Sequence, residues 1–306
     1  MSIEGFATII DVRDLDYSDQ LKRIYGGELF VYQGIPEMQH IVSFTRTFLE
    51  DHLAPFHPTE IHRDGNIDAL PDKLKAVGRA YRAEPRLIEY WHAFYDAIGM
   101  SAESHAEDRV ILRFHIPESA RTNDRLTPHV GQVPPHRDTW GSNLYAQLNW
   151  WAPIYPLAPN RTFSIAPQYW AQPVGNTTRG FDMRRAIRVA ANPGLKASVS
   201  DIVPVMTSPY PYADSVSVLI QPSEILAFSA QHLHAGQPNT SDLTRISLDT
   251  RTIHIDHVRD RLGAVNIDGE APLVALNLFR RISDGCPLHD VLGCSEFEAL
   301  DGGPSA

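Results

Sequence analysis

The chain has 306 residues, of which 43% are hydrophobic and 21% are charged, as in an ordinary globular protein. Its formal net charge of −10 offers no basic field to phosphates, which argues against a nucleic-acid partner and favours a small molecule. No apolar run approaches the roughly 18 residues of a membrane span, and the N-terminus has no basic start before an apolar stretch, so we expect a cytoplasmic protein without membrane contact.

The N-terminal third is predicted to be mostly helical. Residues 27–36 read as a strand that ends in a turn, and 36–53 begin with a proline and carry apolar residues at helical spacing. Further helices are expected over 71–84 and 85–99, each opened by a proline. We therefore expect residues 1–107 to form a strand with supporting helices.

The pattern changes to short β-rich segments after residue 107. These are separated by Pro, Asn, Gly and Ser, and they span 108–118, 143–155, 161–167, 215–221, 224–229 and 243–255. Strands of this length and spacing indicate a barrel or a sandwich. A partly helical, basic insertion at 171–205 is long enough for a lid. We expect one domain over 1–306, with a core at 108–255 and a C-terminal extension at 256–306.

Three His-x-Asp pairs occur, at 62/64, 136/138 and 254/256. We interpret the first as a polar loop and the last as structural, because no further histidine-bearing strand follows it. His136 and Asp138 differ, since we expect them to enter a strand whose residues alternate between two faces. Its polar yet aromatic face suits a small-molecule cavity and consists of Tyr145, Gln147, Asn149 and Trp151.

A third metal ligand is available at the end of the apolar segment 224–229, where His232 and His234 follow. Two imidazoles and one carboxylate form the ligand set of non-heme Fe(II) oxygenases, although zinc also accepts it. Arg245 and Ser247 share one face of the next strand and together are fitted to hold a carboxylate. This pair favours an oxygenase over a zinc hydrolase.

The sequence resembles the iron(II)- and 2-oxoglutarate-dependent dioxygenases, and within them the phytanoyl-CoA dioxygenase-like group. The matching stretches are "HRDTW", "NWWAPIYPLAPNRTFSIAPQYW" and "HAGQPNTSDLTRIS", within roughly 108–255. In this group the distal motif resembles His-x-x-x-x-Asn with an arginine eleven residues after the histidine. His234, Asn239 and Arg245 satisfy both spacings, so the resemblance assigns His234 to iron and leaves His232 to a neighbouring or substrate contact.

The resemblance implies a mainly β fold, a double-stranded β-helix (jelly-roll, cupin-like) core flanked by α-helices. It implies Fe(II), held by His136, Asp138 and His234, and 2-oxoglutarate and O₂ as co-substrates, with Arg245 and Ser247 at the 2-oxoglutarate carboxylate. Halogenating relatives carry a small residue in place of the carboxylate, so Asp138 favours hydroxylation or a related oxidation. The substrate would be a small molecule, by class association one of secondary metabolism.

Several further side chains are expected near the reactants. Gln147 is assigned to the co-substrate, and the substrate-facing set is Arg113, His115, Asn149, Trp151 and His232. The insertion carries Arg179, Arg184, Arg185 and Arg188, which form either a solvated basic face or a lid that recognises an acidic group. A non-catalytic jelly-roll protein that binds a metal or small ligand, and a zinc hydrolase with the same His/Asp/His ligands, stay open as alternatives.

Overall fold

Two β-sheets form the centre of the molecule. The computed structural model describes residues 7–11, 16–120, 130–192, 195 and 198–299. The large sheet has the strand order β1-β2-β8-β5-β10-β3-β12, with β4 also paired to β10, and the small sheet has the order β7-β6-β9. The large-sheet strands are β1 (Ala7–Asp11), β2 (Leu29–Gln33), β3 (His105–Glu107), β4 (Ile111–His115), β5 (Gln147–Pro153), β8 (Ile225–Ser229), β10 (Arg245–His254) and β12 (Arg280–Arg281).

The connections between these sheets are those of a double-stranded β-helix. The small-sheet strands are β6 (Phe163–Ile165), β7 (Val216–Ser217) and β9 (His234–Gly236), and His136 extends this sheet through a bridge to His234. From β4 the chain passes to His136, returns to β5, and runs through β6 and β7 to β8, then through β9 to β10. Every connection on this path except that from β6 to β7 changes sheets, which confirms the jelly-roll core.

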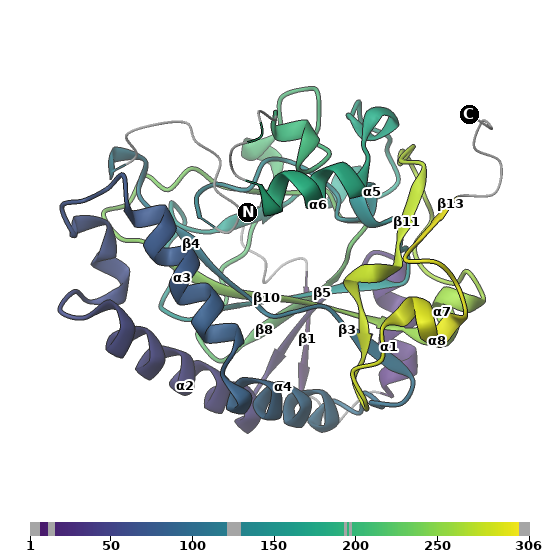
Figure 1. Cartoon of the computed structure of the whole chain (residues 1–306), viewed down its shortest axis with the longest axis horizontal. Helices are drawn as coiled ribbons and strands as arrows, with labels where there is room; N and C mark the ends of the chain where they lie inside the picture. The colour runs from purple at the N-terminus through teal and green to yellow at the C-terminus, as the bar shows by residue number, and fades with distance from the viewer. Residues whose placement is uncertain (1–6, 12–15, 121–129, 193–194, 196–197, 300–306) are drawn as a thin grey trace.

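Helices cover the outer face of the large sheet (Figure 1). They are α1 (Tyr17–Tyr25), α2 (Pro36–Leu53), α3 (Leu70–Arg82) and α4 (Pro85–Ala97). Prolines open α2 and α4 because their missing N–H is not needed in a first turn. The apolar stripes of these helices pack in one core with even-numbered strand residues, among them Leu148, Trp150, Ile246 and Leu248. The predicted helical N-terminal part is therefore confirmed, although α1 was missed.

A second apolar cluster lies between the two sheets. It joins Trp151, Leu226 and Phe228 of the large sheet to Phe163 and Val216 of the small sheet. Odd-numbered residues of β5 and β10 face this interior, since the register pairs Asn149 with Arg251 and Trp151 with Asp249. The expected division of this segment into an apolar and a polar face is thus confirmed from Gln147 onward.

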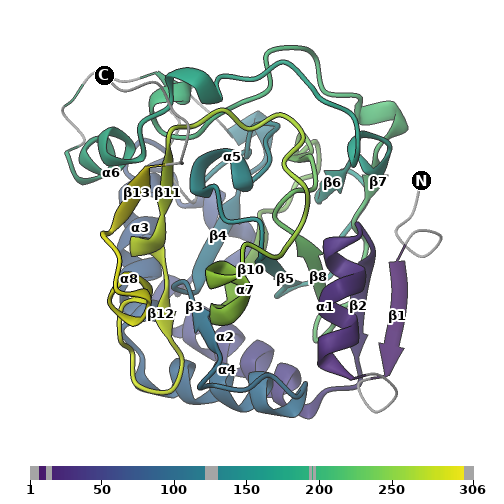
Figure 2. The same ribbon diagram turned by 90° about the vertical axis from the view of Figure 1, so that its right-hand side faces the viewer.

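Three regions outside the core position the rest of the chain. The insertion between β6 and β7 carries α6 (Met183–Ala191), which lies on the side of the large sheet opposite α2 and α4 (Figure 1). The C-terminal region contributes α7 (Ile255–Arg259), β11 (Leu273–Ala275), α8 (Leu288–Leu292) and β13 (Phe297–Ala299), and its β12 extends the large sheet beside β3 (Figure 2). Among the described residues, no helix combines the length and apolar character that a membrane crossing requires.

Candidate metal centre

His136 and Asp138 lie in a loop, whereas the sequence suggested that they enter a strand. That expectation was wrong because α5 (Thr139–Ser142) intervenes and β5 begins only at Gln147. The backbone of His136 exchanges two hydrogen bonds of 3.0 Å with that of His234. This single bridge fixes the loop against β9 and brings two histidines that are 98 positions apart to adjacent places.

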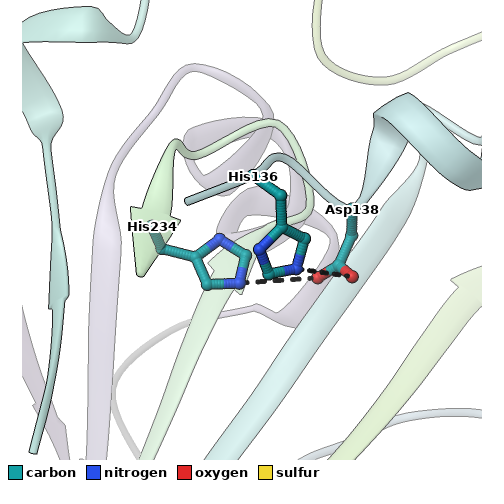
Figure 3. A group of neighbouring side chains, drawn as sticks. All are labelled: His136, Asp138 and His234. Carbon is teal, nitrogen blue, oxygen red and sulfur yellow. Dashed lines mark ion pairs between the residues drawn. The ribbon is translucent and has the colours of Figure 1, made fainter. Parts of the chain in front are cut away.

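The three predicted ligands converge on one point (Figure 3). One ligand atom from each of His136, Asp138 and His234 lies within 4.8 Å of the others. The Nε2 atoms of His136 and His234 lie 3.6 and 3.9 Å from the carboxylate oxygens of Asp138. Two imidazole nitrogens and a carboxylate oxygen at these separations match, in donor type, a site for a first-row divalent metal.

Backbone carbonyls orient both imidazoles. Nδ1 of His136 lies 2.8 Å from the carbonyl oxygen of Pro134, and Nδ1 of His234 lies 3.0 Å from that of His232. A proton on each Nδ1 leaves the Nε2 lone pair free to bind a metal. Burial, together with the adjacent His136 ring, lowers the pKa of His234 to about 3, so this ligand is neutral near pH 7.

Asp138 is held by two neighbours that sequence reasoning did not assign to it. Nδ2 of Asn149 donates to one carboxylate oxygen at 2.5 Å, and Nη2 of Arg251 donates to the other at 3.1 Å. Burial alone would raise the pKa of Asp138, but Arg251 and the two histidines hold it well below its usual range. Arg251 also donates to Asp108 at 2.8 Å. The ligand is therefore ionised and fixed before any metal binds.

Arg245 and Ser247 point into the same barrel interior with unused donors. Arg245 is 3% exposed, and within the part of the chain that the structure describes its Nε and Nη1 have no hydrogen-bond partner; the same is true of Oγ of Ser247. The guanidinium lies 6.0 Å from the Trp151 ring, and burial lowers its pKa to about 10. A buried cation with unused donors is unfavourable alone, so this position is suited to an anion.

The other residues predicted to contact the co-substrate or the substrate have different surroundings. Gln147 donates to Asn149 at 3.0 Å, and its Oε1 has no partner among the described residues, so this side chain adjoins the support of Asp138. Arg113 forms a 2.6 Å ion pair with Asp249, which occupies its guanidinium. His115 is fully buried and lies opposite Arg245 in the β4–β10 register.

His232 lies outside the triad. If the strand extended to His232, the two-residue spacing would direct it to the same face as His234, but β9 begins at His234. Its two ring nitrogens lie 3.2 and 3.1 Å from the carbonyl oxygens of Ser229 and Gly27, and its ring is 4.5 Å from that of Trp170. Burial lowers the pKa of His232 to about 4, so the neutral ring donates to one of these carbonyls, and the contacts hold it away from the triad.

Arg137 lies between His136 and Asp138 in the sequence, and its buried side chain connects several segments of the chain. It donates to the backbone carbonyls of Gln231, Tyr169 and Gln172 at 2.6 to 3.0 Å and to the Asp268 carboxylate at 3.3 Å. Asp268 also accepts from Trp140 Nε1 at 2.7 Å. Sequence reasoning missed this pair and Arg251. For Arg251 a signal existed, because it shares the odd-numbered face of β10 with Arg245.

The arginines of the insertion are mostly engaged in local contacts. Arg179 pairs with Glu270 at 2.6 Å, Arg185 pairs with Asp201 at 2.8 Å, and Arg184 lies 5.2 Å from the Phe297 ring. These contacts favour the solvated-face reading over recognition of an acidic group by α6.

No family model matches the sequence, and no curated protein matches it. Among solved structures, the chain is similar to EvdO2 from Micromonospora carbonacea var. aurantiaca, at 12% identity and a TM-score of 0.44 over 78% of this chain and 91% of that one. In the EvdO2 complex with 2-oxoglutarate the similarity covers 60% of this chain and 64% of that one, with a TM-score of 0.37. The non-heme alpha-ketoglutarate-dependent carbocyclase SnoK from nogalamycin biosynthesis is 14% identical, with a TM-score of 0.42 over 86% and 96%. Likeness at this level assigns neither family nor activity to the chain.

Proposed function

We propose that the protein is a 2-oxoglutarate-dependent, non-heme iron(II) oxygenase that hydroxylates an unactivated C–H bond of a small molecule. One observation carries the proposal: a His136, Asp138 and His234 cluster and a buried Arg245 with unused donors share the interior of one jelly roll. The described elements form this barrel and its supporting layers, which supports a single domain over 1–306.

His136, Asp138 and His234 would hold iron(II), and three protein ligands leave coordination positions for other groups. When bound, iron(II) supplies the oxidising chemistry of this class, with O₂ and 2-oxoglutarate consumed and succinate and CO₂ released. The protein's own contribution is orientation. Arg251 and Asn149 keep Asp138 ionised and in place, and the Pro134 and His232 carbonyls set the tautomers of the imidazoles.

Arg245 and Ser247 would bind the distal carboxylate of 2-oxoglutarate. A guanidinium and a hydroxyl on one strand face provide charge-assisted hydrogen bonds to a carboxylate. The Trp151 ring beside Arg245 and the burial of both donors exclude water, which strengthens the attraction. This function accounts for donors that a zinc hydrolase or a non-catalytic binder would leave unused.

Metal binding tests the ligand assignment with a matched control. We expect His234→Ala, reconstituted with Fe(II) without oxygen, to lose most of its iron, and His232→Ala to retain it, because His232 is engaged with backbone carbonyls. Iron retained by His234→Ala, or succinate still formed by His136→Ala, would contradict the assignment.

Co-substrate binding tests the reaction class. Anaerobic protein with Fe(II) should develop a weak visible charge-transfer band on addition of 2-oxoglutarate, whereas a non-catalytic binder or a zinc enzyme should not. Arg245→Gln should weaken 2-oxoglutarate binding by about 3 to 5 kcal/mol, because it leaves a carboxylate without its buried partner. An unchanged affinity in this variant, measured from the same band, would place the carboxylate elsewhere.

A further inference from the structure

A large groove lies along the edge of the jelly roll, between α3, α4 and β4 on one side and the insertion that carries α6 on the other. Its volume is about 1940 Å³. In Figures 1 and 2 α6 lies above α3. Residues of both helices line the groove. Its lining does not include the three metal-ligand residues, but it reaches Asp108. Since Arg251 bridges Asp108 and Asp138, one side chain separates the groove from the ligand carboxylate.

Six Lys and Arg side chains line this groove. Arg281 pairs with Asp284 and Arg280 donates to the carbonyl oxygen of Gly285, whereas the other four form no ion pair within the described residues. Lys75, Arg79 and Arg82 follow one another at spacings of four and three on α3, which places them on one helix face, and Arg109 joins them from the β3–β4 connection. Within the described chain, the cationic groups of these four side chains form no ion pair and no hydrogen bond, although the backbone N–H of Arg109 donates to Asp108 at 2.7 Å.

Five acidic residues also line the groove, and one of them, Asp284, pairs with Arg281; the others are Asp68, Asp72, Glu107 and Asp108. Glu107 lies 3.0 Å from Nε2 of His92, and Asp108 accepts from Arg251. Asp72 also lines the groove, in the first turn of α3, where the helix dipole favours a carboxylate. Burial, followed by the charges of Arg109 and Arg79, lowers the pKa of Arg82. Like charges this close repel one another, and a bound anion would relieve that repulsion.

Apolar side chains complete the lining. Ile88 of α4, Ile187 of α6 and Leu195 of the insertion are 52%, 40% and 52% exposed, and all three face the groove. Large aliphatic side chains left in water cost free energy unless a ligand covers them, and ligand pockets combine such walls with a few polar groups. The groove therefore offers both a wall for an apolar body and a cluster of donors for an anionic group.

We propose that this groove binds the substrate and that the substrate is a free small molecule with an apolar body and an anionic group, held by Arg79, Arg82 and Arg109. The identification of this ligand as the substrate rests on the proposed oxygenase function. The binding itself depends only on the groove. The basic group that recognises the anion thus comes from α3 and the β3–β4 connection. The sequence suggested only the insertion arginines for this role, with a solvated face as the alternative.

Two fluorescent probes with one apolar body test this assignment on the metal-free protein. 8-Anilinonaphthalene-1-sulfonate carries a sulfonate, and N-phenyl-1-naphthylamine lacks it. We expect the double variant Arg79→Gln, Arg109→Gln to bind the sulfonate about tenfold or more weakly, because two charge-assisted contacts are lost, and to bind the neutral probe as the wild type does. Ile88→Asn should weaken the binding of both probes.

The matched control is Arg185→Gln, Arg188→Gln, which removes the same charge from neighbouring α6 at positions that do not line the groove. This variant should bind both probes within twofold of the wild type. Equal sulfonate affinity in wild type and groove variant, or equal losses in groove and control variants, would overturn the proposal. Because no metal is used, failure here leaves the oxygenase assignment intact, and a failure of 2-oxoglutarate to bind leaves the groove assignment intact.

Discussion

The fully buried Arg137 yields the strongest prediction about stability. Arg137→Met keeps an elongated side chain of similar reach but removes every donor, which leaves the Asp268 carboxylate and the carbonyls of Gln231, Tyr169 and Gln172 without this partner. Breaking a buried ion pair from one side costs about 3 to 5 kcal/mol. The carbonyl losses add to this cost, although not independently, because one side chain supplies all of them.

We therefore expect Arg137→Met to lower the free energy of unfolding by about 4 kcal/mol or more, a large part of the roughly 5 to 15 kcal/mol of a typical protein. Urea unfolding followed by circular dichroism measures this change. The control is Arg179→Met, which breaks the ion pair with Glu270, two positions from Asp268, but at a side chain that is 85% exposed. Because water screens such an exposed pair, its loss should change the free energy of unfolding little.

The same substitution should also impair the metal centre. Arg137 stands between His136 and Asp138 and fixes their loop to the insertion and to the C-terminal region, so Arg137→Met should weaken Co(II) binding, measured by calorimetry, while Arg179→Met should not. Equal stability losses in the two variants would refute the reasoning, because it rests on the difference between a buried and an exposed ion pair.

Three other substitutions have defined outcomes. Arg251→Gln should weaken Co(II) binding about 10- to 100-fold, since it releases Asp138; unchanged calorimetric titrations would contradict this. Burial lowers the pKa of His105 to about 4, below the roughly 6.5 of the unfolded chain, so its stabilisation is complete above about pH 6.5 and lost as the pH falls toward 4. In the wild type this effect should lower the free energy of unfolding by up to about 3 kcal/mol between about pH 6.5 and pH 4, and His105→Asn should lose less over the same range. Urea unfolding measures both, and equal pH dependence in the two proteins would argue against the role of His105. Trp150→Phe should cost about 1 to 2 kcal/mol, because Thr252 loses the 2.8 Å bond from Nε1, and an unchanged urea midpoint would speak against that role.

The elements that could be predicted are those with strong local signals. Residues 36–53 contain a first-turn proline and a regular apolar stripe, and α2 has these bounds. The alternation of β5 and β10 placed Asn149, Arg245 and Ser247 on the inner face, as observed. Local signals misled where tertiary pairing decided. Around His136 and Asp138 we expected the start of a strand. The structure instead has a loop, held to His234 by one backbone bridge, and the short helix α5.

The sequence by itself determined the helical N-terminal layer and the two-faced strands, because hydrophobic periodicity is a local property. It also supplied His136 and Asp138, whereas the choice of His234 over His232 rested on the spacing of the family that the chain resembles. Only the tertiary structure decided which charges are paired. Two buried pairs join segments that are far apart in sequence, Arg251 with Asp138 and Arg137 with Asp268. The groove likewise brings Arg109 beside α3, where Lys75, Arg79 and Arg82 have no ion-pair partner in the described chain. Pairing across such separations is set by how sheets and helices pack, and no spacing within one segment encodes it.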